Sequence, residues 1–313
     1  MDAAAVGEVD QHQESPVLDC LLVVVSYRSA SDVAGLLETV PAAAGDLSWH
    51  VVVVNNEPAD DLARIVADHP DAELVESGKN VGYAGGINRG LLDAPPTRWT
   101  VFLNPDLRLG PGSIARLTEV AGQRDAAVPT IVDGEGVLQC SLRREPTILG
   151  SVGDAFFGDR WPGRPPVLGE TIRDRATYAH PAVVAWATGA LLVVPSAVVR
   201  RVGPWDSGHF FLYSEETDYC RRLRSLGVEV RFVPDAVVRH QGAGSGTSDA
   251  LHALQEVNRV RYFRKWHGRL ASAGFAGVVV LNSAIRTHRS QSRAALRALV
   301  SSNARASLPG GGR

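Results

Sequence analysis

The chain has 313 residues, 45% hydrophobic and 21% charged, which is typical of a globular protein with a substantial core. Its formal net charge of −2 gives no indication of nucleic-acid binding. Cys20, Cys140 and Cys220 form neither a metal-ligand spacing nor a disulfide framework, which predicts a protein of the reducing cytoplasm. No apolar run approaches the roughly 18 residues of a membrane span. Residues 1–16 lack the apolar core of a signal peptide and are predicted to be disordered.

The charge is distributed unevenly along the chain. Residues 251–313 contain 11 Lys and Arg against one acid, Glu256, a net charge of +10. The other 250 residues contain 21 basic and 33 acidic side chains, a net charge of −12. A basic C-terminal part on an acidic body predicts contact with an anionic surface or ligand. The alternative is a solvated, partly disordered tail over residues 290–313.

Two apolar runs near the start of the chain predict buried strands, at residues 20–25 and 51–54, and residues 73–75 predict a weaker strand. Each run ends in small or polar residues and is followed by a helical pattern, the first of which Ser31 can cap. This alternation predicts a doubly wound, mostly parallel sheet in one large α/β domain, which we place at residues 17–248.

Residues 78–90 (GKNVGYAGGINRG) form a glycine-rich stretch that leads into a helix. Glycines let a backbone approach a ligand closely, and the N–H groups at a helix N-terminus favour anions. A plain tight turn is the alternative interpretation. The stretch therefore indicates a ligand site only if another motif lies beside it.

The next strand, residues 100–103, supplies that motif, because it ends in the polar corner Asn104-Pro105-Asp106. Open α/β sheets bind their ligands at the carboxyl ends of their strands, where this carboxylate is expected to lie. Asn-Pro-Asp is also good turn chemistry on its own. The glycine-rich stretch one strand earlier favours the ligand site.

The second half of the chain is less regular. Residues 130–139 predict a hairpin around Asp-Gly, and residues 140–181 predict surface connections over the site. Strands are predicted at residues 191–195 and 228–233, and a helix rich in Arg and aromatic residues at 249–267.

Three carboxylates, Glu215, Glu216 and Asp218, occupy the first turn of another predicted helix. Acids are favoured near the positive end of a helix dipole, which explains them without catalysis. Asp218 in particular is expected to pair with Arg221 or Arg222 one turn on. The other two are the stronger candidates for a general base.

Asp106 and His240 can share a divalent cation with phosphate oxygens, because Mg²⁺ and Mn²⁺ accept carboxylate, imidazole and phosphate ligands. Such a cation neutralises a diphosphate leaving group, and a second carboxylate can take the proton of an attacking hydroxyl. His240 taken alone fits a structural histidine as well. Together the motifs predict group transfer from a nucleoside-diphosphate-activated donor to an alcohol.

In their order along the chain, these motifs resemble those of family 2 glycosyltransferases of the GT-A fold, and among them the bacterial rhamnosyltransferase-like branch that builds cell-wall and surface polysaccharides. The resemblance covers about residues 19–248. It implies an inverting glycosyltransferase that moves rhamnose or a related hexose from a dTDP- or UDP-sugar and uses Mg²⁺ or Mn²⁺. The implied acceptor is a saccharide or a polyprenyl-diphosphate-linked molecule. Residues 249–313 would form a helical basic extension that contacts the inner face of the plasma membrane peripherally.

The resemblance also implies a role for each site residue. The metal ligands would be Asp106 and His240, and the base Glu216, with Glu215 and Asp218 as alternatives. The acceptor side would be formed by Thr188, Gly189, Ala190, Trp205 and Asp206. The donor would be bound by Ser26, Tyr27, Asn55, Asn80, Gly82, Tyr83, Ala84, Gly85, Asn88 and Asn104. Residues 241–248 would form a flexible segment that closes over the donor.

Two positions depart from the family pattern. Asn55 stands where the family usually has an Asp that meets the nucleobase, and Glu216 where the base is usually Asp. A non-catalytic nucleotide-sugar-binding protein therefore stays open as an alternative. A sugar-phosphate nucleotidyltransferase is the other, although it usually carries a glycine-rich loop directly after the first strand, and residues 26–30 contain no glycine.

Overall fold

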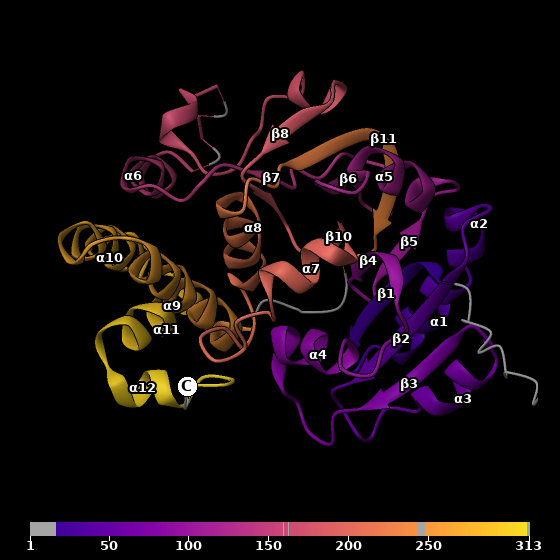
Figure 1. Cartoon of the computed structure of the whole chain (residues 1–313). Helices are drawn as coiled ribbons and strands as arrows, with labels where there is room; N and C mark the ends of the chain where they lie inside the picture. Colours follow the sequence, from indigo (N-terminus) through magenta and orange to yellow (C-terminus); the bar gives the residue numbers. More distant parts are fainter. Residues whose placement is uncertain (1–16, 159, 162, 243–247, 312–313) are drawn as a thin grey trace, which may run out of the picture.

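The computed structural model describes residues 17–158, 160–161, 163–242 and 248–311. The predicted disorder of residues 1–16 lies outside the described residues, as does most of the predicted closing segment at 241–248. Figure 1 shows a body built on a sheet, with the C-terminal helices grouped beside it.

A single large sheet organises the body. Within the described residues it has nine strands in the order β3-β2-β1-β4-β10-β6-β11-β5, with β8 paired to β11. The strands are β1 (Leu18–Ser26), β2 (Trp49–Asn55), β3 (Ala72–Glu76), β4 (Thr97–Leu103), β5 (Leu107–Leu109), β6 (Ala126–Val132), β8 (Ala182–Val184), β10 (Leu191–Pro195) and β11 (Val230–His240). Only β5, β8 and β10 run against the others, so the predicted mostly parallel sheet is confirmed. A small second sheet pairs β7 (Leu142–Arg143) with β9 (Trp186–Ala187).

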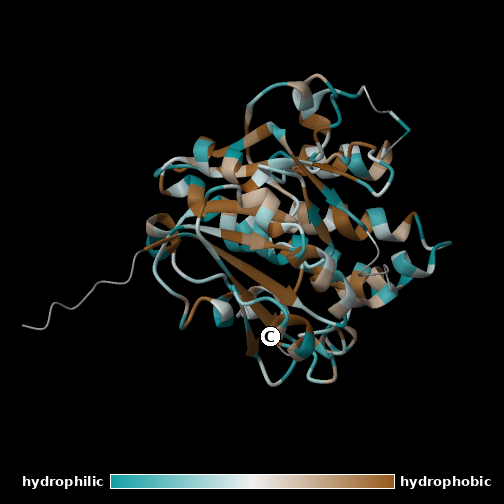
Figure 2. Ribbon diagram, turned by 90° about the vertical axis from the view of Figure 1, so that its right-hand side faces the viewer, coloured by the Kyte–Doolittle hydropathy of each residue, from teal (hydrophilic) through white to brown (hydrophobic). Residues whose placement is uncertain are grey.

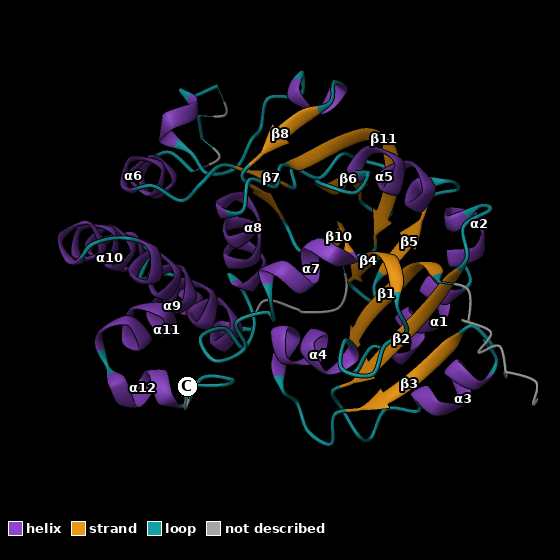
Figure 3. Cartoon of the chain, viewed as in Figure 1, coloured by secondary structure: helices purple, strands orange, loops and turns teal. Residues whose placement is uncertain are grey.

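Helices cover both faces of the sheet, as Figure 3 shows. The helices of the body are α1 (Ala30–Leu37), α2 (Val40–Ala44), α3 (Leu62–Ala67), α4 (Gly82–Gly90), α5 (Ser113–Ala121), α6 (Ile148–Phe156), α7 (Ser196–Val202) and α8 (Glu215–Ser225). Short 3₁₀ turns, η1 (Pro166–Leu168) and η2 (Thr177–Ala179), lie between α6 and β8. The C-terminal helices are α9 (Asp249–Trp266), α10 (Arg269–Ala284), α11 (Ser290–Val300) and α12 (Ser302–Ala306).

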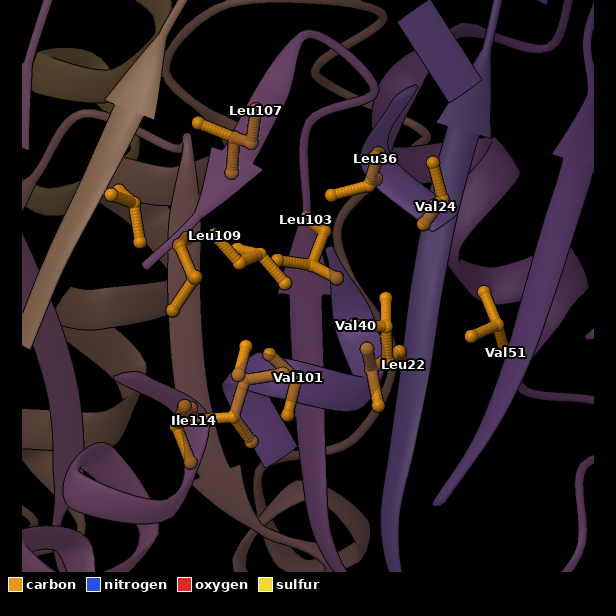
Figure 4. Packing of buried hydrophobic residues seen from close by; sticks show 14 of the residues in the cluster. Leu22, Val24, Leu36, Val40, Val51, Val101, Leu103, Leu107, Leu109 and Ile114 are labelled. Carbon is orange, nitrogen blue, oxygen red and sulfur yellow. The ribbon is translucent and has the colours of Figure 1, made fainter. Parts of the chain in front are cut away.

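The apolar runs of the sequence form two cores, one on each face of the sheet. Successive side chains of a strand point to opposite faces, so Leu22 and Val24 of β1 enter one core and Leu21 and Val23 the other. Figure 4 shows Leu22 and Val24 packed near Leu36 and Val40 in the core beneath α1, α2 and α5. Figure 2 shows these strands as hydrophobic ribbons inside more hydrophilic loops. A strand buried on both faces therefore reads as a continuous apolar run.

The glycines of α4 let this helix lie directly on the sheet. A Cβ on Gly86 would stand 2.6 Å from Val25, and one on Gly90 would stand 2.9 Å from Val23. The two glycines are one turn apart, so they form a bare stripe on one face of the helix. Part of the glycine-rich stretch thus serves packing, and only its N-terminal end is free to meet a ligand.

Three of the predicted elements are corrected. The first helix begins at Ala30 behind Ser29, so Ser31 does not cap it. The turn after β6 forms, but its return arm is only a single bridge between Val132 and Leu138. The disordered-tail alternative is wrong over the described residues, because α11 and α12 are ordered there.

The long helix α9 matches its predicted range and joins the C-terminal helices to the body. Arg259 of α9 reaches Glu170 and Glu256, with nitrogen–oxygen distances of 3.4 Å to each. Its guanidinium also lies over the ring of Phe275 from α10, 6.0 Å from the centroid. This cation therefore holds together α9, α10 and the segment that follows α6.

We predict that Arg259→Ala lowers the free energy of unfolding by about 3 kcal/mol, because it leaves two largely buried carboxylates without their cation. Urea unfolding followed by tryptophan fluorescence measures the change. Arg200→Ala, at an exposed arginine, is the control and should change it by less than about 0.5 kcal/mol. Equal effects of the two substitutions would contradict the assigned role of Arg259.

Candidate active site

A cavity of about 1220 Å³ opens at the carboxyl ends of the parallel strands, the edge where sheets of this kind bind ligands. Its walls come from the strand ends, the start of α4, the loop before α8, the segment after β7 and the inner face of α9. The predicted site residues that line it are Tyr27, Asn80, Gly82, Tyr83, Asn104, Asp106, Thr188, Gly189, Glu215 and Glu216. Donor-side, acceptor-side and acidic motifs thus meet in one cavity.

Asp106 lines this cavity, and His240 lies directly beside Asp106. The Nε2 atom of His240 is 3.1 Å from the Oδ2 atom of Asp106. The contact arises because β5, which follows Asp106, pairs antiparallel with the end of β11, where His240 stands opposite Leu107. The backbone N–H of Gln241 also donates to the carbonyl of Asp106 at 3.0 Å.

The chemistry of this donor pair fits a hard divalent cation, which accepts carboxylate and imidazole ligands. Among the described residues, no group of three or more His, Cys, Asp and Glu side chains is arranged to hold a metal ion. Asp106 and His240 would therefore leave most coordination positions to the oxygens of a ligand and of water. This suits an ion that is held jointly by protein and phosphate.

A strained turn presents the acidic residues to the cavity. Tyr213 and Ser214 both have left-handed backbone angles, with φ of 70° and 69°, immediately before α8 begins. Such angles are uncommon for residues other than glycine and cluster at functional sites. Ser214 occupies the N-cap position, but its side chain makes no capping hydrogen bond. The turn therefore orients the first residues of α8 toward the cavity and does not stabilise the helix through a side-chain cap.

Glu215, which is buried, and Glu216, which is partly buried, form an acid pair at this helix start. One carboxylate oxygen of each is buried and has no hydrogen-bond partner among the described residues. Burial raises the pKa of Glu216 to about 7, while the charge of Arg143 opposes that rise. Burial and the neighbouring Glu216 raise the pKa of Glu215 well above its usual range. A carboxylate that titrates near neutral pH suits general-base catalysis.

Gly189 and Tyr83 frame the acid pair. A Cβ on Gly189 would lie 3.5 Å from the Cβ of Glu216, so glycine leaves room beside the carboxylate. The hydroxyl of Tyr83 donates to the carbonyl of Gly189 at 3.3 Å. Burial raises the pKa of Tyr83, and the charges of Glu215, Glu216 and Asp106 raise it further. The tyrosine therefore stands, protonated, among all three acids.

On the donor side, Asn56 rather than Asn55 lines the cavity. The side chain of Asn55 is engaged by Glu76 at 3.1 Å and by the backbone of Glu57 at 3.0 Å. Asn56 donates to the carbonyl of Gly82 at 3.0 Å, and its Oδ1 atom is buried without a partner among the described residues. The sequence prediction missed Asn56, although neighbouring residues at a strand end point in opposite directions.

Several predicted contact residues belong to the framework instead. Asn88 binds both the N–H and the carbonyl of Trp205 at 2.8 Å. Trp205 is 2% exposed and stacks on Tyr219 with ring centroids 4.3 Å apart. Asp206 pairs with Lys265 at 2.6 Å. The remaining predicted residues that do not line the cavity, apart from Asp218 and His240, are Ser26, Ala84, Gly85 and Ala190.

Asp218 has the structural role that was expected of it. It is fully buried and pairs with Arg222 at 3.0 Å, not with Arg221. It also pairs with Lys265 at 2.7 Å and accepts from the indole of Trp266 at 2.8 Å. It does not line the cavity, so of the three acids in the first turn of α8 only Glu215 and Glu216 do.

The sequence prediction also missed the wall opposite the strand ends. Arg143 and Trp186 line the cavity from the small sheet, with the guanidinium 5.7 Å from the indole centroid. Glu256, Arg259 and Tyr262 line it from α9. The only signal in the sequence was the density of Arg and aromatic residues in these segments, because neither segment carries a recognisable motif.

With this geometry in place, comparisons with known proteins identify the family. A family model described as glycosyltransferase like family 2 matches residues 18–261. An N-acetylglucosaminyl-diphospho-decaprenol L-rhamnosyltransferase of Mycobacterium tuberculosis is 26% identical over 255 residues, which cover 77% of this chain and 82% of that protein. The low-salt glycan biosynthesis hexosyltransferase Agl10 of Haloferax volcanii is 26% identical over 224 residues, 70% of this chain and 66% of that protein.

The fold has solved counterparts. The mannosyltransferase PcManGT from Pyrobaculum calidifontis, solved with GDP-Man and Mn²⁺, aligns with a TM-score of 0.56 at 17% sequence identity. The alignment covers 95% of this chain and 79% of that one. This likeness confirms the predicted GT-A type of fold. None of the described helices combines the length and apolar character that crossing a membrane requires.

We predict that Gly82→Ala disrupts the donor end of the cavity. Gly82 has φ of +81°, and a Cβ there would stand 2.2 Å from the carbonyl oxygen of Phe211, whose loop leads into α8. Gly78→Ala is a matched control, since Gly78 has φ of +74° and open space around its Cβ position. The control should lose about 1 kcal/mol through backbone strain alone.

The Gly82 variant should lose more stability than the control in urea unfolding and should bind dTDP or UDP at least about tenfold more weakly by calorimetry, a difference of about 1.4 kcal/mol. Equal stability and equal nucleotide affinity in the two variants would show that the contact with Phe211 has no influence on the site.

Proposed function

We propose a specific reaction for this chain, which belongs to glycosyltransferase like family 2 and is a glycosyltransferase. It moves rhamnose or a related hexose from a dTDP- or UDP-sugar to an acceptor hydroxyl, with inversion at the anomeric carbon. The observation that carries the proposal is that Asp106, which is in contact with His240, lines the same cavity as Glu215 and Glu216. The groups that would stabilise the departing diphosphate and the group that would deprotonate the acceptor hydroxyl are then close enough to act on the same bound substrates.

The acceptor proposed is a saccharide carried on a polyprenyl diphosphate. The name of the Mycobacterium tuberculosis relative gives an acceptor of that kind and rhamnose as the transferred sugar, which supports both choices. We propose residues 17–248 as the transferase domain and 249–313 as an extension whose helix α9 walls the acceptor side of the cavity. A lipid-linked acceptor would bring the enzyme to the inner face of the plasma membrane.

Asp106 and His240 would hold Mg²⁺ or Mn²⁺, which when bound neutralises charge on the departing diphosphate. Tyr27, Asn56 and Asn80 line the donor end of the cavity and would orient the nucleoside there. At the other end, Arg143 faces the base, and its positive charge favours the ionised carboxylate. The two ends of the cavity thus have different tasks.

In the chemical step, Glu216 takes the proton of the acceptor hydroxyl. The freed oxygen attacks the anomeric carbon from the face opposite the diphosphate and forms the new glycosidic bond. The bond between the anomeric carbon and the diphosphate oxygen breaks, and its electron pair leaves with the nucleoside diphosphate. The space beside Gly189 lets the acceptor approach Glu216, whose longer side chain would replace the Asp usual in the family.

We predict that Glu216→Gln lowers kcat for sugar transfer by about 100- to 10,000-fold while the donor still binds, because the amide cannot accept the proton. In the wild type, kcat/KM should rise with pH through about 7, since Glu216 is protonated and inactive below that value. Arg143→Gln should move this ascending limb to higher pH, because it removes the charge that lowers the pKa of Glu216.

Transfer rates between pH 5.5 and 9 with a dTDP-sugar and a UDP-sugar panel measure both effects. Asp133→Asn, in an exposed turn, is the charge-matched control. Near wild-type transfer by Glu216→Gln would exclude this base, and tight donor binding without turnover in the wild type would favour the non-catalytic alternative.

We predict that Mn²⁺ together with dTDP or UDP raises the Tm of the wild type, because a ligand at 100 times its Kd stabilises the native state by about 2.7 kcal/mol. Asp106→Asn and His240→Ala should lose most of the part of this shift that depends on Mn²⁺. His180→Ala, at an exposed histidine, is the control and should keep it. An unchanged Mn²⁺-dependent shift in the first two variants would contradict the proposed metal ligands.

A further inference from the structure

A second cavity, of about 430 Å³, lies outside the active site where the ends of α6 and α10 meet. Arg160, Arg286 and Arg289 converge on it. In the part of the chain that the structure describes, none of the three forms an ion pair with a carboxylate. Burial lowers the pKa of Arg286, and the charges of Arg289 and Arg160 lower it further. The cavity therefore concentrates positive charge that an anion would neutralise.

Exposed apolar side chains flank this charge. Phe156, which lines the cavity, is 53% exposed, and Ile285, also in its wall, is 49% exposed. Leu270 and Leu281 on α10 are 91% and 45% exposed. Leu270 lies at the start of α10, Leu281 in its last turn and Ile285 just beyond its end, and at 3.6 residues per turn the three positions fall within about 60° of one another. This face carries an interrupted apolar stripe, with Gly274 and Gly277 between Leu270 and Leu281, and its C-terminal end meets the three arginines.

Apolar side chains beside a cluster of arginines are the pattern of a surface that lies in a membrane interface, with the arginines at the lipid phosphates. A protein partner would require a matching acidic and apolar surface, for which nothing in the molecule argues. The charge instead complements an anionic lipid headgroup, and the exposed Phe156, Leu281 and Ile285 suit shallow insertion among acyl chains.

The second cavity is also next to the active site. Gly158 lines both cavities. Asp154, one turn before it, lines the active site, whereas Phe156 lines the outer cavity. Figure 1 shows α6 and α10 together on the side of the molecule away from β1–β3. A molecule anchored in a membrane on this side would reach the active site along the end of α6.

We propose that the α6–α10 face, defined by Arg160, Arg286, Arg289, Phe156, Leu270 and Leu281, docks on an anionic phospholipid membrane and binds a lipid phosphate in the cavity between its arginines. Docking there would present the lipid-linked acceptor to the active site, and only this consequence rests on the proposed function. The binding itself depends on the charge and the apolar stripe alone.

The test is co-sedimentation of the full chain with vesicles of phosphatidylcholine, with and without 30% phosphatidylglycerol. The wild type should bind the anionic vesicles and be released by 0.5 M NaCl, because salt screens surface charge. The triple variant Arg160→Gln/Arg286→Gln/Arg289→Gln should bind about 100-fold more weakly, at about 1 kcal/mol for each arginine near the surface. The control Arg64→Gln/Arg124→Gln/Arg200→Gln removes the same charge from exposed positions elsewhere and should bind nearly as the wild type does.

Leu270→Ser should weaken vesicle binding, whereas Leu92→Ser, at a leucine 65% exposed on another surface, should not. Equal binding of neutral and anionic vesicles, or equal losses in the two triple variants, would overturn the proposal. Donor hydrolysis with Mn²⁺, together with Tm, shows whether each variant is folded. If the wild type binds vesicles but has no transferase activity, the result would contradict the proposed function and still support the docking surface.

Discussion

The pairing of β5 with β11 is the constraint on which the site depends. It is a short antiparallel ladder, yet it places His240 opposite Leu107 and so beside Asp106, across more than 130 residues of sequence. The other edge of β11 is fixed by its parallel pairing with β6 in the sheet. The two metal-ligand candidates are thus positioned by backbone hydrogen bonds of a buried sheet, which tolerates little displacement. Moving either strand would separate them.

The acid pair is positioned by a different means, which reduces stability. Two non-glycine residues in left-handed conformation and two poorly satisfied carboxylates stand at the start of α8. Such features persist only where the surroundings hold them, and here α8 is anchored by Asp218 and by the aromatic stack of Trp205 on Tyr219. Burying the Glu216 carboxylate is unfavourable for folding, but it raises the pKa of Glu216 to about 7. A general base is most effective when its pKa lies near the working pH.

The C-terminal helices link the site to the outer surface. The inner face of α9 walls the cavity, and Arg259 ties that helix to Glu170 and to the ring of Phe275 on α10. The outer face of α10 carries the apolar stripe and meets the end of α6, which lines both cavities. One group of helices can therefore complete the acceptor side and set the orientation of the enzyme on a lipid surface.

The sequence by itself determined the sheet, the order of the motifs and the cavity edge they share, because buried strands and glycine-rich turns leave local patterns. It also predicted roles for Asp106, His240 and Glu216, which lie in or beside such patterns. Only the tertiary structure decided that Asn56 and not Asn55 faces the cavity, that Trp205 is framework, and that Arg143 and α9 form the opposite wall. Those outcomes depend on contacts between segments far apart in the chain. Local sequence spacing does not determine whether such a contact buries a side chain or leaves it facing the cavity.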